Sequence, residues 1–402
     1  RLKETISAVV NLDDSYLTIQ GPPGTGKTYT AKHIIAELVK KGMRVGISSN
    51  SHKAINNLLV GVAQQCNDED INVACFCTRD TGDEIEENGI EVIGNSDLND
   101  CVQTSCVIGT TAWGFCRDEI EGELDYLFID EAGQVSVANL IGMSRSTRNI
   151  VLMGDQMQLG QPSQGTHPAD SGLSILDYLL HESPTIPDSM GVFLDTTYRM
   201  HSAVNYFISN AIYEGKLNAH LENDQQSVAV PENYSGLLDK EAGIVIVPVE
   251  HEGNTQASDE EVSVIKELAS QLIGRVFTDK EGNKRQIAWP DMLFVAPYNH
   301  QVNKLRIALG DKAQVGSVDK FQGQEAPVVF LSMCTSDASE SLRGIDFLFD
   351  KHRINVAVSR AQALAIVVAN PKLQEQSVNS LSQLTKVNTF CRLMTQSDDI
   401  IE

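Results

Sequence analysis

A glycine-rich segment close to the N-terminus carries the residue types that bind a nucleotide polyphosphate. It runs Gly21-Pro22-Pro23-Gly24-Thr25-Gly26-Lys27-Thr28 and fits the pattern GxxxxGK[ST]. The glycines allow the backbone to wrap the phosphates, so that amide groups and the N-terminus of the next helix meet the negative charge. Lys27 can reach the β and γ phosphates, and the Thr28 hydroxyl can hold Mg²⁺. A plain glycine-rich turn would explain the glycines but not the Lys-Thr pair.

Two carboxylates follow an apolar run about a hundred residues later. The run Leu127–Ile129 leads into Asp130 and Glu131. In an open α/β sheet, ligands bind at the carboxyl ends of the strands, so we expect this pair to lie at the same edge as the phosphate-binding segment. Asp130 would hold Mg²⁺, and Glu131 would orient and deprotonate an attacking water. Gln158, after the next apolar run, would contact the γ-phosphate or that water.

Two arginines are candidates for neutralising the charge that develops during phosphoryl transfer. Arg199 lies in the segment TTYRMH. Arg360 lies in the apolar segment 354–361, where a lone cation has little reason to be. The alternative for each is an ordinary ion pair or an exposed position.

Short apolar runs alternate with helical patterns, which predicts α/β domains with parallel sheets and helices on both faces. This alternation of apolar runs and helical patterns starts again after Pro184 and Pro187. We therefore expect two domains in tandem, at 1–188 and 189–372, followed by a helical tail at 373–402. The first domain would carry an acidic insertion at about 66–100. The strands predicted in it are 16–20, 44–48, 106–110, 126–129 and 150–153.

The composition excludes several classes of protein. The 402 residues include 54 acidic and 31 basic side chains, giving a formal charge of −23, and 42% are hydrophobic, which excludes a disordered tail and a collagen. No apolar stretch is long enough for a membrane span. Residues 66–100 hold eleven acids and one base, and residues 222–261 hold ten acids and one base. The remainder is nearly neutral, so a polyanion can still bind there.

The eight cysteines are too sparse for a disulfide scaffold, and none forms a CxxC pair. We therefore expect reduced thiols and a cytoplasmic protein. Six of them lie between Cys66 and Cys116, where four thiolates could hold zinc or an iron–sulfur cluster, although the spacing fits neither usual pattern. Buried, idle thiols are the favoured alternative. Trp113 could stack on a nucleic-acid base, or it could pack in the core or against a helix.

Eight segments, in order, resemble the helicase motifs of superfamily 1B, in its Upf-like branch. They are GPPGTGKT, SSNSHKAINNL, FIDEAGQ, GDQMQLGQP, TTYRMH, VAPYNHQ, VGSVDKFQGQE and INVAVSRA. The resemblance covers about residues 5 to 370. It implies two RecA-like P-loop domains with mainly parallel sheets, ATP and Mg²⁺ in the cleft between them, and a single strand of DNA or RNA crossing both. It also implies movement from 5′ to 3′ along that strand.

The resemblance assigns roles to further residues. It makes Gln158 the γ-phosphate sensor, and Arg199 and Arg360 the two arginine fingers. Tyr198 would lie near the adenine and Glu325 near the ribose. The positions implied to contact the strand are mostly small hydroxyl, amide and backbone groups, which grip phosphates without reading bases. They are Ser49, Asn50, Ser51, Thr110, Thr111, Pro297, Tyr298, Ser317, Val318 and Asp319.

The sequence therefore predicts a monomeric nucleic-acid-dependent ATPase that acts as a helicase or translocase. It starts at Arg1 rather than Met, and we expect it to be part of a longer protein in which a nuclease domain can precede it. Two alternatives stay open. The chain could be an ATPase that remodels or clamps nucleic acid without unwinding, or a binding module that ATP merely switches.

Overall fold

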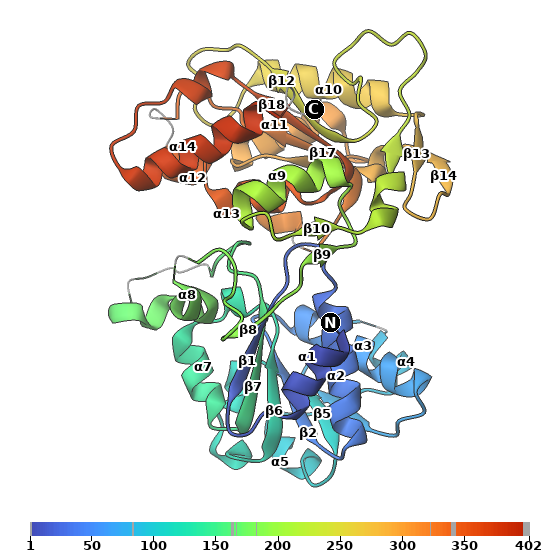
Figure 1. The fold of residues 1–402 in the computed structure, drawn as a ribbon, viewed down its shortest axis with the longest axis vertical. Helices are drawn as coiled ribbons and strands as arrows, with labels where there is room; N and C mark the ends of the chain where they lie inside the picture. Colours follow the sequence, from blue (N-terminus) through green and yellow to red (C-terminus); the bar gives the residue numbers. More distant parts are fainter. Residues whose placement is uncertain are drawn as a thin grey trace. The chain divides into compact units, whose positions relative to one another are not determined.

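The computed structural model describes residues 2–82, 84–161, 165, 167–181, 183–321, 323–338 and 343–396. Asp83 of the acidic block, Gln322 and the last six residues of the predicted tail lie outside this set. The chain divides into two compact units (Figure 1). The first comprises Arg1–Pro22, Gly26–Gln156 and Gly160–Leu194, and the second comprises Pro23–Thr25, Met157–Leu159 and Asp195–Glu402.

The first unit is built on an eight-stranded sheet in which every pair of neighbours is parallel. The strand order is β4-β3-β5-β2-β6-β7-β1-β8. The strands are β1 (Tyr16–Gln20), β2 (Arg44–Ser48), β3 (Ala74–Cys77), β4 (Glu91–Val92), β5 (Cys106–Gly109), β6 (Leu124–Ile129), β7 (Thr147–Gly154) and β8 (Gly191–Phe193). The helices are α1 (Leu2–Val10), α2 (Lys27–Lys40), α3 (His52–Asp68), α4 (Glu84–Glu87), α5 (Leu98–Cys101), α6 (Ala112–Phe115), α7 (Val137–Ser144) and α8 (Ile175–Leu180).

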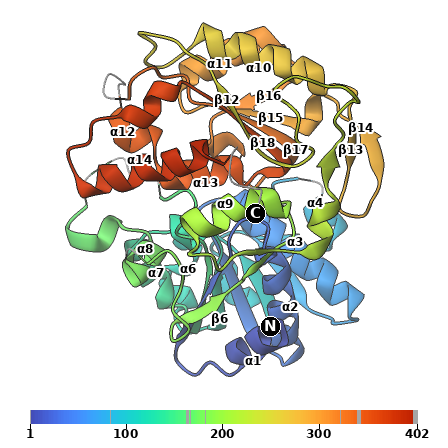
Figure 2. The ribbon, with the colours of Figure 1, turned by 45° about the horizontal axis from the view of Figure 1, so that its top comes forward.

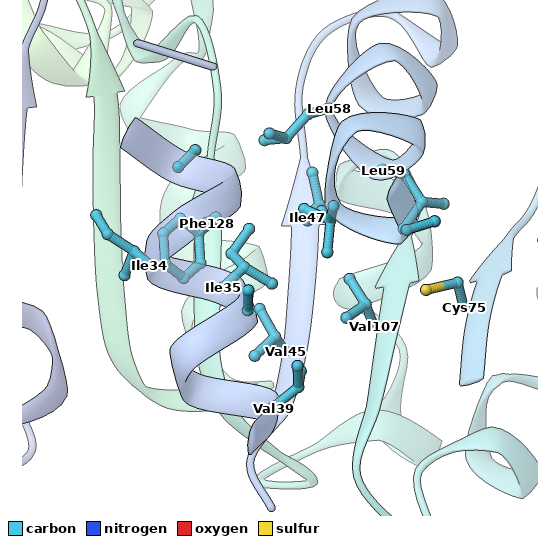
Figure 3. Packing of buried hydrophobic residues seen from close by; sticks show 14 of the residues in the cluster. Ile34, Ile35, Val39, Val45, Ile47, Leu58, Leu59, Cys75, Val107 and Phe128 are labelled. Carbon is cyan, nitrogen blue, oxygen red and sulfur yellow. The ribbon is translucent and has the colours of Figure 1, made fainter. Parts of the chain in front are cut away.

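Alternate residues of these strands enter two different cores, because successive side chains of a strand point to opposite faces of the sheet. On one face, Val45, Ile47, Val107 and Phe128 pack against α2 and α3, as Figure 3 shows. On the other face, side chains such as Leu127 pack against α6, α7 and α8. Burial of each aliphatic side chain stabilises the fold by about 1.5–3 kcal/mol relative to an exposed position. Packing on both faces therefore holds the strands in place, together with the segments that follow their ends.

The second unit has a five-stranded parallel sheet of order β12-β18-β17-β15-β16. These strands are β12 (Gly243–Pro248), β15 (Met292–Val295), β16 (Gln314–Gly316), β17 (Ala326–Ser332) and β18 (Ala361–Ala369). Smaller pairings join β9 (Thr196–Thr197) to β10 (Asn218–Ala219), and β13 (Val276–Thr278) to β11 (Ser227–Val228) and β14 (Lys284–Gln286).

Helices cover both faces of this second sheet. They are α9 (Ser202–Ile212), α10 (Asp259–Leu272), α11 (Asn299–Leu309), α12 (Gly344–Leu348), α13 (Lys351–Val358) and α14 (Leu381–Met394). The first face carries α10 and α11, and the opposite face carries α9, α13 and α14 (Figure 2). The predicted α/β fold with two large parallel sheets is confirmed.

Short 3₁₀ helices connect several elements. They span Asp118–Ile120, Ala132–Gln134, Ala169–Gly172, Leu221–Gln225, Trp289–Asp291, Asp319–Phe321 and Pro371–Glu375. In the first unit, the acidic block at 66–100 contributes β3 and β4, which extend one side of the large sheet. No helix of the described residues is long and apolar enough to cross a membrane.

Candidate nucleotide-binding and strand-binding site

One edge of the first sheet gathers most of the predicted site. Because the strands are parallel, their carboxyl ends meet there, and the register pairs Gln20 with Gly154, Ile129 with Leu152, and Ile47 with Gly109. The segments that follow these neighbouring strands carry the predicted nucleotide and strand residues of the first unit. They are 21–22 and 26–28 after β1, 130–131 after β6, 49–51 after β2 and 110–111 after β5.

The glycine-rich segment forms a tight turn between β1 and α2. Gly26 is the N-cap of α2 and has a φ of 78°, a left-handed conformation that glycine adopts without steric cost. The amide of Gly21 donates to the carbonyl of Gly154 (2.9 Å), which ties the start of the turn to β7. The Lys27 ammonium folds back and donates to the Gly21 carbonyl (2.7 Å), while Thr28 is exposed at the helix N-terminus. The turn thus has the local geometry of a phosphate-binding loop.

The tip of this turn, Pro23–Thr25, is part of the second compact unit. The Thr197 hydroxyl donates to the Pro23 carbonyl (2.9 Å), and the Tyr198 amide donates to the Gly24 carbonyl (2.9 Å). A Cβ at Gly24 would lie 2.5 Å from the Cβ of Arg199 and 2.7 Å from the Thr197 hydroxyl. Gly24 therefore allows a close approach of two backbones that no side chain would permit.

We expect Gly24→Ala to lower the melting temperature by several degrees and to weaken ATP binding. The added methyl combines a steric overlap of about 1–3 kcal/mol with the left-handed cost of a φ of 74°. Gly42→Ala is the matched control, because Gly42 has a φ of 84° and nothing within 4 Å of its Cβ position. Thermal unfolding and titration with a fluorescent ATP analogue measure both variants. Equal behaviour of the two would contradict the close-approach argument.

Asp130 and Glu131 form a carboxylate pair directly after β6. Asp130 is buried, and its Oδ1 accepts from the Glu131 amide (2.9 Å). Burial raises the pKa of the Asp130 carboxyl, the charge of Glu131 raises it further, and the Lys27 ammonium opposes both effects. Glu131 is a non-glycine residue with a φ of 53°, a costly conformation that is concentrated at functional sites.

The residues at this edge fit Mg²⁺. A buried carboxylate beside a second carboxylate is short of positive charge, as the raised pKa of Asp130 indicates, and a divalent cation would supply it. Carboxylate and hydroxyl oxygens are the ligands that Mg²⁺ prefers. Asp130 and Thr28 would be its protein ligands.

Gln20 is a positioning residue that the sequence analysis missed. It is fully buried at the end of β1, where its side-chain amide donates to the Asp155 carboxylate (3.2 Å) and to the Pro184 carbonyl (2.9 Å). Its side-chain oxygen accepts from the Ile186 amide (2.7 Å). Gln20 thereby fixes the ends of two strands next to the phosphate-binding loop. A lone amide at the last position of an apolar strand was the available signal.

In the second unit, Arg199 pairs with Glu325. The Arg199 Nε lies 2.6 Å from the Glu325 carboxylate, and a second guanidinium nitrogen donates to the Ser359 carbonyl (3.2 Å). Gln362 donates to the other Glu325 oxygen (2.9 Å). Burial raises the pKa of Glu325, but the positive charge of Arg199 and the two hydrogen bonds outweigh it, so the pKa is lowered overall. Glu325 is therefore ionised at neutral pH.

Arg360 lies in the same unit and is only 2% exposed. Its terminal nitrogens donate to the carbonyls of Gln324 (3.1 Å) and Val318 (3.3 Å), and its Nε has no hydrogen-bond partner among the described residues. Burial and the nearby charge of Arg199 lower the pKa of Arg360 to about 9, so the guanidinium stays charged at neutral pH. Two neighbouring cations, one with an unused donor, suit the binding of an anion.

Two other predicted nucleotide residues also belong to the second unit. Tyr198 is exposed, and its ring lies 4.9 Å from the ring of His220. Gln158 is partly exposed within the segment Met157–Leu159. This segment is held by Asn355, whose side-chain amide donates to the Met157 carbonyl (2.8 Å).

The predicted strand-contacting residues divide into buried and accessible groups. Thr110 is buried and bonds Thr78 through its hydroxyl (2.8 Å), and Tyr298 is buried against Phe347, so both support their segments. Ser49 is also buried, together with Val318. The accessible positions are Asn50, Ser51 and Thr111 after β2 and β5, and Pro297, Ser317 and Asp319 after β15 and β16. Asp319 is paired with Arg353 (3.3 Å).

The cysteines and Trp113 have different environments. Cys66, Cys75, Cys77 and Cys106 are buried, and burial raises the pKa of Cys75 and of Cys106 to about 12, so these thiols stay protonated. The described residues contain no group of three or more His, Cys, Asp or Glu side chains suited to a metal ion. Trp113 is exposed, so the core-packing alternative for this residue was wrong.

The chain is similar to known proteins over most of its length. A family model described as an AAA domain matches residues 172–372, half of the chain, and a second model with that description matches residues 3–174. The DNA replication ATP-dependent helicase/nuclease JHS1 of Arabidopsis thaliana is 24% identical over 397 residues, which are 92% of this chain and 28% of that protein. The regulator of nonsense transcripts 1 of Caenorhabditis elegans is 26% identical over 415 residues, 88% of this chain and 36% of that protein.

The chain thus spans about a third of the length of these curated relatives. Among solved structures, the arterivirus nonstructural protein 10 (helicase) in complex with DNA aligns with a TM-score of 0.47 at 15% identity, over 92% of this chain and 63% of that chain.

Proposed function

The chain belongs to the AAA-domain family of P-loop ATPases, within the Upf-like branch of the superfamily 1 helicases, and from this premise we propose that it hydrolyses ATP to move along single-stranded nucleic acid. Membership of a P-loop ATPase family implies the use of ATP and Mg²⁺ in general. We also propose that the enzyme moves from 5′ to 3′ and that the strand along which it moves is DNA or RNA.

One observation carries the proposal. The phosphate-binding loop, the carboxylate pair and the accessible hydroxyl and amide groups follow neighbouring strands of one sheet and lie at one edge of it. The Ser48 carbonyl at the end of β2 accepts from the Asp130 amide (2.8 Å), so the carboxylate pair and Ser49–Ser51 follow directly from two hydrogen-bonded segments. A sheet edge that holds both ligands supports coupling of hydrolysis to strand binding.

The proposed site residues of the two units have separable tasks. Lys27 and the loop amides hold the phosphates, and Glu131 orients the attacking water and takes its proton. Mg²⁺, held by Thr28 and Asp130, would neutralise part of the charge on the β and γ phosphates. Arg199 and Arg360 of the second unit would stabilise the charge that develops on the transferred group, with Gln158 contacting the γ-phosphate. Tyr198 and Glu325 would hold the adenine and the ribose.

The experiment for this proposal is strand displacement on duplexes with a 5′ tail, a 3′ tail or no tail, made of DNA or RNA. We expect ATP-dependent displacement from the 5′-tailed duplex and none from the other two. Hydrolysis stimulated by a single strand, without displacement of any duplex, would favour a remodelling or clamping ATPase. Strand binding that ATP alters without turnover would favour a nucleotide-gated switch.

The place of action is also a proposal. The eight cysteines are free thiols, which supports a reducing compartment such as the cytoplasm. We further propose that the chain works as a monomer.

A further inference from the structure

Trp113 is unusually exposed for a tryptophan. It lies on the single-turn helix α6, just after β5, and 83% of its surface is accessible. Tryptophan side chains are normally largely buried, because transfer of the large ring from water is favourable. An exposed ring at the ligand-binding edge of a parallel sheet therefore calls for a partner.

The segment that carries this ring is firmly anchored. Phe115, two residues later, is completely buried in the core formed with α7 and α8. Gly114 is buried too, and a Cβ there would lie 2.4 Å from the Thr110 side chain. The Cys116 amide donates to the Ala112 carbonyl (2.9 Å), which closes the turn. The ring is thus presented on a fixed backbone, so little ordering entropy is lost when a ligand stacks on it.

A basic residue lies at the end of the adjacent strand. β3 pairs with β5, and the Thr78 amide donates to the Gly109 carbonyl (3.2 Å). Arg79 comes next. Its carbonyl accepts from the side-chain amide of Asn56 on α3 (2.8 Å), and the Arg79 side chain is exposed. Burial lowers the pKa of His52, the first residue of α3, and the positive charge of Arg79 lowers it further. Arg79 is the one base within the acidic block.

We propose that Trp113 stacks on a base of the bound single strand and that Arg79 contacts a phosphate of the same strand. These groups follow three neighbouring strands: Arg79 follows β3, Thr111 and Trp113 follow β5, and Ser51 follows β2. Aromatic stacking with backbone contacts is the combination that binds single strands with little sequence preference. This inference rests on the proposed function and adds a stacking platform to it.

The chain contains two tryptophans, which makes the inference directly measurable. Trp289 lies in the second unit, next to Phe294 with 6.2 Å between the rings. In a Trp289→Phe protein, all tryptophan emission comes from Trp113. We expect oligo(dT) or oligo(U) to quench this emission in a saturable manner, at the concentrations where the strand binds in an independent anisotropy titration.

Substitutions separate the two contacts. Trp113→Ala should weaken strand binding by about 5- to 150-fold, the equivalent of one lost stacking contact, without changing its salt dependence. Trp113→Phe keeps a ring and should recover part of the affinity. Arg79→Ala should reduce the slope of log affinity against log salt concentration by about 0.7, because one phosphate contact is lost.

Ile141→Ala is the matched control, since Ile141 is 65% exposed on α7 of the same unit. It should bind the strand like the wild type, and equal melting temperatures would show that Trp113→Ala is folded. A wild-type protein that binds strands while the Trp113 emission and the Trp113→Ala affinity stay unchanged would overturn the stacking inference alone. Absence of any strand binding by the wild type at low salt would overturn the proposed function as well.

Discussion

Arg360→Ala is expected to reduce kcat for ATP hydrolysis by about 10³- to 10⁵-fold while ATP affinity changes only a few-fold. The proposed arginine finger acts on charge that appears only in the transition state, so its loss should spare binding of the ground state. The burial of this guanidinium, together with its unused Nε donor, makes it a preorganised group for such charge. Steady-state kinetics and equilibrium binding of ATP measure the two quantities separately.

A loss of stability must be separated from a loss of catalysis, because Arg360 also donates to two backbone carbonyls. Arg275→Ala provides the match. Arg275 is a buried arginine of the same unit, which donates to the carbonyls of Leu238 (3.0 Å) and Gln271 (3.1 Å). It should destabilise the fold to a similar degree and leave kcat unchanged. Equal kcat values for Arg360→Ala and Arg275→Ala would remove Arg360 from the transition state.

Glu131→Gln should lower kcat by about 10²- to 10⁴-fold and leave ATP binding intact. The amide has nearly the same shape as the carboxylate but cannot take a proton from the attacking water. Substitution by glutamine also keeps a side chain of similar size at the strained φ of 53°, so the loop should retain its shape. Single-turnover hydrolysis, measured beside ATP binding, reports the chemical step directly.

The matched control for this second prediction is Asp125→Asn on the same strand. Asp125 lies near the opposite end of β6, where it pairs with Arg44 (3.2 Å). Its substitution removes a carboxylate from β6 without touching the ligand-binding edge. A kcat reduced as much by Asp125→Asn as by Glu131→Gln would show that the effect comes from the strand and not from the proposed base.

The parallel sheets and the phosphate-binding loop could be predicted because each depends on local sequence. Tyr16–Gln20 and Arg44–Ser48 were predicted as strands with the observed limits, since apolar runs bounded by turn residues determine them. The predicted run 150–153 is shorter than β7, which begins at Thr147 with three polar residues, of which Thr147 and Asn149 are partly buried and Arg148 is exposed. A stretch of three polar residues contains no apolar run, so nothing in the sequence marks it as the start of a strand.

The exposure of individual site residues could not be predicted, because it depends on packing between distant segments. Thr110 and Thr111 are neighbours of similar type, yet Thr110 is buried by its contact with Thr78, and Thr111 remains accessible. The ion pair of Arg199 with Glu325 joins residues 126 positions apart. Likewise, Trp113 is exposed although Phe115, two residues later on the same short helix, is completely buried. A motif identifies the residue types of a site, and tertiary contacts decide which of them a ligand can reach.

The most direct test of the account is ATP turnover by the wild-type chain with Mg²⁺, measured with and without single-stranded DNA and RNA. Turnover should rise severalfold with at least one of the two polymers, and Lys27→Ala should abolish both the basal and the stimulated rate. A wild-type rate that neither polymer changes would contradict a nucleic-acid-dependent ATPase. A Lys27→Ala protein that hydrolyses ATP like the wild type would contradict the assignment of the ATP-binding site.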